Sequence, residues 1–135
     1  MQFKLPKDDP KYRWTNHVIR KMMHYGLSPD RVKRVIRAPK RMEVGIAENT
    51  KAAMQPTGSA KNPSEVWVMW AERLPGQGGQ KATKAPGRAG NPLQTVQKVI
   101  ITAWRYPGIS PVRDEIPIPA TILAELKREK LFDSL

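Results

Sequence analysis

Residues 14 to 41, WTNHVIRKMMHYGLSPDRVKRVIRAPKR, predict two helices joined by a tight turn. Gly26 can adopt the left-handed conformation that ends a helix, and Ser28 is a residue type that caps the start of the next one. Pro39 disfavours helical geometry at Ala38, so the second helix is expected to end there. The rest of the chain is expected to be arranged around this helix pair.

Each predicted helix has an apolar stripe and a basic stripe. The apolar stripes comprise Trp14, Val18, Met22 and Tyr25 in the first helix and Val32, Val35 and Ile36 in the second. The basic stripes comprise Arg13, His17, Arg20, Lys21 and His24, and then Arg31, Lys33, Arg34 and Arg37. One side of the pair is therefore expected to build a core, and the other gathers positive charge around a histidine.

Strand patterns follow the helix pair. Met42, Val44 and Ile46 alternate with Arg41, Glu43 and Gly45, which is the pattern of a half-buried strand, and residues 50–54 are expected to return beside it. Two nearly continuous apolar runs, EVWVMWA at 65–71 and VIITAW at 99–104, predict an adjacent antiparallel pair of central strands. The composition of residues 55–63 predicts a loop.

The predicted fold class is α+β, with an N-terminal helix pair, a small antiparallel sheet and a C-terminal helix at 119–132, all helices lying on one face of the sheet. The predicted organisation has four parts: a lead-in at 1–13, one domain at 14–107, a flexible basic Gly/Pro-rich insertion within it at 75–95, and a C-terminal extension at 108–135.

The charge of the chain is high and uneven. Its 135 residues carry a net charge of +12, and residues 11–41 hold ten Lys or Arg against one acid. Residues 73–113 hold seven against none, whereas residues 114–135 are slightly acidic. This distribution indicates an anionic partner, with nucleic acid as the first candidate and an anionic membrane surface as the second.

The residue types and patterns that the sequence lacks argue against several other classes of protein. Without cysteine, disulfides and thiolate metal sites are excluded, and with two histidines and no carboxylate cluster, no metal site or cofactor is expected. The chain has neither a signal-peptide pattern nor an apolar run of membrane-spanning length. We expect a cytoplasmic protein that does not interact with membranes.

Metal-independent cleavage of RNA is the chemistry that the remaining residues could support. It needs a proton-transfer group and cations that face the phosphorane, and His17 with Arg20 and Lys21 would provide them. Arg105, between two aromatic residues at the end of a predicted strand, is the fourth candidate catalytic residue. The alternative is that His17 packs against the sheet and its basic neighbours only solubilise the helix.

The candidate nucleic-acid contacts are basic residues of the helix pair and the insertion, together with two aromatic residues that could stack on bases. They are Arg13, Arg31, Arg34, Arg37, Lys40, Arg41, Lys81, Lys84, Arg88, Trp104 and Tyr106.

The pattern H-x4-M-x2-Y-G-L-S-x3-V-x2-V-I-x2-P, which runs here from His17 to Pro39, resembles a bacterial and archaeal domain family similar to the RelE/BrnT-type toxins of the barnase-like ribonuclease superfamily. VIITAWRYPG at 99–108 also resembles the last strand of that family. The resemblance covers residues 14–107 without the insertion. It implies a RelE/BrnT-like sheet that holds mRNA, site residues at His17 and Arg105, and an acidic antitoxin as a protein partner.

Three functions remain open from the sequence. The first is a toxin-type endoribonuclease acting on mRNA. The second is a non-catalytic module that binds RNA or the ribosome through the same basic side. The third is a helix-turn-helix DNA binder that uses the helix at 28–37, although its exposed Arg and Lys would bind phosphates rather than specify bases.

Overall fold

The computed structural model describes residues 5–47, 49–73, 96–111 and 116–129. Its elements are β1 (Tyr12–Trp14), α1 (Asn16–Tyr25), α2 (Pro29–Arg37), β2 (Arg41–Val44), β3 (Thr50–Gly58), β4 (Pro63–Arg73), β5 (Gln97–Pro107) and α3 (Ala120–Arg128). The predicted flexible insertion at 75–95 lies outside the described residues. The α+β class is confirmed.

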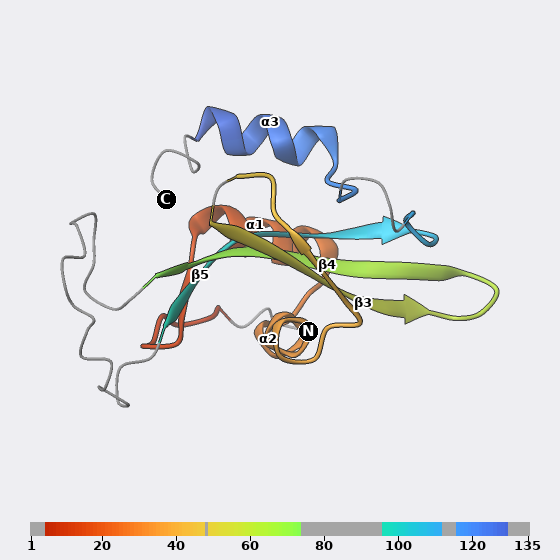
Figure 1. Ribbon diagram of the computed structural model, residues 1–135, viewed down its shortest axis with the longest axis horizontal. Helices are drawn as coiled ribbons and strands as arrows, with labels where there is room; N and C mark the ends of the chain where they lie inside the picture. Colours follow the sequence, from red (N-terminus) through yellow and green to blue (C-terminus); the bar gives the residue numbers. More distant parts are fainter. Residues whose placement is uncertain (1–4, 48, 74–95, 112–115, 130–135) are drawn as a thin grey trace.

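The five strands form one sheet in the order β1-β5-β4-β3-β2 (Figure 1). β4 and β5 are adjacent and antiparallel, as their apolar composition predicts. Trp67 and Trp70 of β4 are 0% and 1% exposed, because both faces of the central strands are covered.

β1 corrects the predicted order of elements, because a strand precedes the helix pair. It pairs in parallel with β5, so the sheet is mixed rather than antiparallel. Trp14 belongs to this strand and not to the first helix, although it packs in the same core as Val18 and Met22. Thr15 begins α1, since its hydroxyl accepts a hydrogen bond from the Val18 amide at 3.1 Å.

The turn between α1 and α2 has the predicted caps. Gly26 lies in the left-handed region at φ 70° and ends α1. The Ser28 side chain accepts a hydrogen bond from the Arg31 amide, and Pro29 occupies the first turn of α2. These local signals fix where the helix pair bends.

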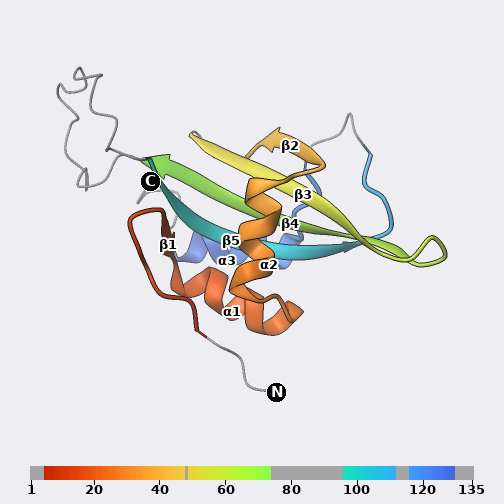
Figure 2. The same cartoon turned by 90° about the horizontal axis from the view of Figure 1, so that it is seen from below.

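The helices lie on both faces of the sheet, so the prediction that they share one face is wrong. Figure 1 shows the sheet nearly edge-on with α3 above it and α2 below, and Figure 2 shows α2 crossing in front of the strands. Val32, Val35 and Ile36 of α2 pack in one core with Val18 and Met22 of α1. Ile122 and Leu126 of α3 pack in a second core with the stacked rings of Trp67 and Trp104. The C-terminal segment therefore completes the core of the described fold.

Two further expectations about the strands are wrong. Residues 55–58 continue β3 rather than forming a loop, and Pro56 is tolerated there because β2 pairs only as far as Met54. In β2 the alternation is as predicted but the buried face is reversed. Arg41 lies over the Trp67 ring on the α3 side, so Met42 and Val44 point the other way and are 50% and 79% exposed.

Candidate nucleic-acid interface

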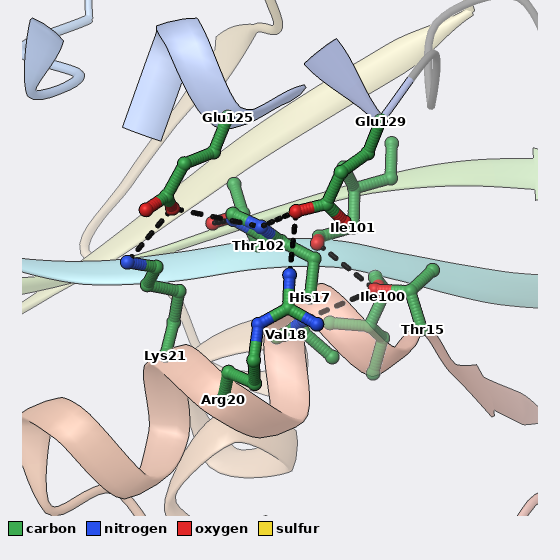
Figure 3. Close-up of polar contacts among 10 residues, drawn as sticks. All are labelled: Thr15, His17, Val18, Arg20, Lys21, Ile100, Ile101, Thr102, Glu125 and Glu129. Carbon is green, nitrogen blue, oxygen red and sulfur yellow. Dashed lines mark hydrogen bonds and ion pairs between the residues drawn. The ribbon is translucent and has the colours of Figure 1, made fainter. Parts of the chain in front are cut away.

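His17 is buried where α1, β5 and α3 meet (Figure 3). Its Nε2 lies 2.9 Å from the hydroxyl of Thr102, which is itself buried on β5. Its Nδ1 lies 3.8 Å from a carboxylate oxygen of Glu125 on α3 and 3.7 Å from one of Glu129, the residue that caps the end of α3. Both ring nitrogens therefore face groups of the protein.

The two carboxylates facing His17 are already paired with cations of α1. The Lys21 ammonium lies 2.8 Å from Glu125, and this contact is the main reason that the pKa of Glu125 lies below its usual value. Arg20 donates a hydrogen bond to Glu129. Arg20 and Lys21 thus dock α3 onto α1, and their charges are balanced within the molecule.

Burial lowers the pKa of His17, and this effect outweighs the two carboxylates, which act in the opposite direction. The ring is therefore neutral at neutral pH. A neutral imidazole is the form that a general base requires, but a base must also come within hydrogen-bonding distance of its substrate. At 1% exposure, His17 offers no nitrogen to a bound RNA.

Arg105 lies on the opposite face of the sheet from the His17 cluster. Its Nε donates a 2.9 Å hydrogen bond to the carbonyl of Tyr25, the last residue of α1. Thr102 and Arg105 are three positions apart on β5, so their side chains project from opposite faces. Of the four predicted catalytic residues, the structure brings together His17, Arg20 and Lys21 and leaves Arg105 apart from them.

The cations around α2 form a separate set, here called the α2 basic face. It comprises Arg31, Arg34, Arg37, Lys40 and Arg105. Arg34, Arg37 and Lys40 are exposed, whereas Arg31 and Arg105 are half-buried. Within the described part of the chain none of the five forms an ion pair, although Arg20, Lys21, Arg41 and Lys51 all do. Positive charge on this face is therefore not paired with any carboxylate of the described residues.

The hydrogen bonding and the pKa of Arg31, a member of the α2 basic face, are both affected by its burial. Its Nε is buried and has no hydrogen-bond partner. Burial lowers the pKa of its guanidinium, and the positive charges of Arg105 and Arg34 lower it further. The charge of Arg31 is therefore repelled by those of Arg105 and Arg34.

The other predicted nucleic-acid contacts do not join this face. Trp104 is fully buried against Trp67, so it cannot stack on a base. Tyr106 is half-buried and packs against the second core, on the α3 side. Arg41 pairs with Glu43 and donates to Ser110 on the α3 side. Arg13 projects from β1 on the side away from its buried neighbours Tyr12 and Trp14. Lys81, Lys84 and Arg88 lie outside the described residues.

The sequence reasoning missed the acidic residues that neutralise the basic stripe of α1. Glu125 of α3 and its C-cap residue Glu129 are four positions apart, so they share one side of the helix, in a slightly acidic part of the chain. That spacing could have indicated a helix that pairs with basic residues elsewhere. Nothing in the sequence indicated which basic helix it would choose.

Comparison of the chain with protein-family models, with curated proteins and with solved structures gives no match. The similarity to the RelE/BrnT-type toxins therefore rests on the sequence pattern alone. Within the described ranges, no three His, Asp or Glu side chains are arranged to hold a metal ion. No helix in those ranges is both long and apolar enough to cross a membrane.

Proposed function

We propose that this protein binds RNA by holding the phosphate backbone against the α2 basic face. The observation that carries the proposal is the contrast between the two sides of the sheet. On the α3 side Arg20, Lys21 and Arg41 are paired with carboxylates, whereas the five cations of the α2 basic face have no such partner in the described chain.

The physical reason is the cost of gathering like charges. Adjacent cations repel one another unless solvent or a bound anion screens them, and a protein with a net charge of +12 strengthens that repulsion. Phosphate groups relieve it, and each contact releases counterions from the nucleic acid. An extended polyanion fits a row of basic residues that follows a helix and continues into the next segment.

The residue types favour contact with the backbone over reading of bases. Arg and Lys bind phosphates without specifying sequence, and the described residues include no exposed Trp, Tyr or Phe on which a base could stack. The sequence resemblance to RelE/BrnT-type toxins favours RNA over DNA as the nucleic acid. We expect broad binding rather than recognition of one sequence.

The surroundings of His17 lead us to propose binding rather than cleavage. A ribonuclease that used His17 would need the ring to leave its contact with Thr102 and α3 to lift from α1. Lifting α3 would break the ion pairs that Glu125 and Glu129 form with Lys21 and Arg20. An antitoxin partner would follow only from a toxin activity, so it is not included in this proposal.

Incubation of the purified protein with labelled RNA in EDTA tests the proposal. We expect RNA to be bound and recovered intact. Arg34→Ala with Arg37→Ala should weaken binding, whereas Lys127→Ala with Arg128→Ala, an equal loss of exposed charge from α3, should not. Equal affinities of the two double variants, or tighter binding of duplex DNA than of RNA, would contradict the proposal. Cleaved RNA would restore the ribonuclease hypothesis.

A further inference from the structure

Three arginines of the α2 basic face lie near the turn that joins α1 to α2. Arg31 lies in the first turn of α2, Arg34 follows it one turn later, and Arg105 approaches from β5. The hydrogen bond from Arg105 Nε to the Tyr25 carbonyl holds its guanidinium next to this turn, because only Gly26, Leu27 and Ser28 separate Tyr25 from α2. The arginines of the cluster therefore come from α2 and the central strand β5, and the end of α1 holds Arg105 in place.

This cluster lacks carboxylate partners within the described chain, and one of its nitrogens is buried without an acceptor. Arg31 Nε is buried without an acceptor, and none of the three side chains pairs with a carboxylate among the residues that the structure describes. Buried polar groups are rarely left unsatisfied, and like charges are rarely held together without an anion between them. These features describe a binding position for an anion with several acceptor oxygens.

We propose that Arg31, Arg34 and Arg105 bind the terminal phosphate of an RNA strand, a phosphomonoester. This inference rests on the proposed function and names the part of the RNA that the cluster recognises. A phosphomonoester carries a charge of about −1.5 to −2 and three acceptor oxygens. A phosphodiester within the strand carries one charge and offers two such oxygens. Three guanidinium forks match the terminal group better in both charge and number of acceptors.

Arg37 and Lys40, the remaining cations of the α2 basic face, would contact phosphates within the strand rather than at its end. Arg37 lies six residues beyond Arg31 on α2, which is a rise of about 9 Å along the helix axis. Lys40 follows after the helix ends. A strand whose end is held by the cluster would continue past Arg37 and Lys40, which would contact its internal phosphates.

A first experiment uses inorganic phosphate as the probe. Thermal melting is followed in phosphate and in chloride at equal ionic strength and pH. We expect phosphate to raise the melting temperature of the wild type and of Arg37→Gln, and to leave that of Arg31→Gln unchanged. No phosphate-specific shift in the wild type, or an undiminished shift in Arg31→Gln, would overturn the phosphate site. Melting in chloride shows that each variant is folded.

A second experiment compares three versions of one short RNA, carrying a 5′-phosphate, a 3′-phosphate or hydroxyls at both ends. Wild-type protein should bind at least one phosphorylated version about tenfold more tightly than the hydroxyl version, and the preferred end identifies the phosphate that is recognised. Arg31→Gln and Arg105→Lys should lose this preference, and Arg37→Gln should keep it while binding all three more weakly. The Lys variant retains the charge and removes the fork together with the Nε–H that Arg105 donates to Tyr25.

The outcomes separate this inference from the proposed function. Binding of RNA without any preference for a phosphorylated end would overturn the inference and leave the proposed function intact. A phosphate-specific rise in melting temperature that depends on Arg31, with no RNA binding, would overturn the proposed function and retain the anion site. A preference for phosphorylated ends that survives in both Arg31→Gln and Arg105→Lys would show that these residues are not the site.

Discussion

His17 shows how a single residue can have the sequence pattern of a catalytic group and the surroundings of a structural one. Its helix position beside Arg20 and Lys21 matches the arrangement that phosphodiester chemistry uses. In the fold, however, those two cations turn toward α3 and His17 lies beneath them in contact with Thr102. The residue joins three elements, so we expect its loss to affect stability first.

Replacing His17 by Ala should lower the free energy of unfolding by on the order of 2 kcal/mol. The substitution removes a fully buried ring and leaves the Thr102 hydroxyl without its partner. Chemical denaturation followed by tryptophan fluorescence would measure the change, because Trp67 and Trp104 pack in the neighbouring core. His24→Ala, on the exposed side of the same helix, is the control and should change stability little. Equal stabilities of the two variants would contradict this account.

The stability of the protein should fall as the pH is lowered from 7.5 to 5.5. Burial lowers the pKa of His17 in the folded state, whereas the unfolded chain keeps an ordinary value near 6.5. The unfolded state therefore binds the proton first, and acid favours unfolding. The carboxyl group of Glu125 contributes only at lower pH, because its pKa is lowered from an ordinary value of 4.5.

Melting temperatures at several pH values measure this effect, and His17→Gln, which cannot titrate, provides the comparison. The fall between pH 7.5 and 5.5 should be smaller in that variant. A wild-type melting temperature that rises in this interval would show that the carboxylates hold His17 in its protonated form.

Among the elements, those whose ends are set by neighbouring residues were predictable and those set by distant contacts were not. Gly26 and Ser28 specify the turn between α1 and α2 through local backbone geometry and a side-chain cap. β1 has three residues and exists because β5 lies beside it, so no local pattern defines it. Trp14 of β1 lies at helical spacing from Val18 and Met22 by coincidence, which is why the predicted first helix begins too early. Thr15 is a residue type that caps a helix, and it indicates where α1 begins.

The face of the sheet on which α3 packs could not be predicted from the sequence either. Its apolar residues at 122 and 126 specify an amphipathic helix, but both faces of the β4–β5 pair are apolar, so either face could have received it. Pairing of Glu125 and Glu129 with Lys21 and Arg20 accompanies its docking on one of them. Such contacts join residues about a hundred positions apart, so they produce no periodic pattern in the sequence.

Leu126→Ala should destabilise the protein by about 2–5 kcal/mol, since Leu126 is fully buried between α3 and the sheet. Leu123→Ala, one turn earlier and only half-buried, should cost clearly less. Urea unfolding gives both values. Similar small losses in both variants would mean that α3 is an appendage and does not belong to the core.

At the scale of the whole molecule, the charge distribution follows from which basic residues find acidic partners. The two acid-poor regions of the sequence, residues 11–41 and 73–113, contain all five residues of the α2 basic face. The sequence could not separate them from Arg20, Lys21 and Arg41, because that separation depends on where α3 and Ser110 pack. The folded chain therefore has one side on which Arg20, Lys21 and Arg41 are paired with carboxylates and one side that we propose faces RNA.

The salt dependence of RNA binding tests this central claim most directly. Dissociation constants are measured over a range of salt concentrations for the wild type and two double variants, Arg34→Ala with Arg37→Ala and Lys127→Ala with Arg128→Ala. Each phosphate contact to a single strand contributes about 0.7 to the slope of log affinity against log salt. The account predicts that the slope falls by about 1.4 in the α2 variant and stays at the wild-type value in the α3 variant. Equal slopes in all three proteins would contradict it.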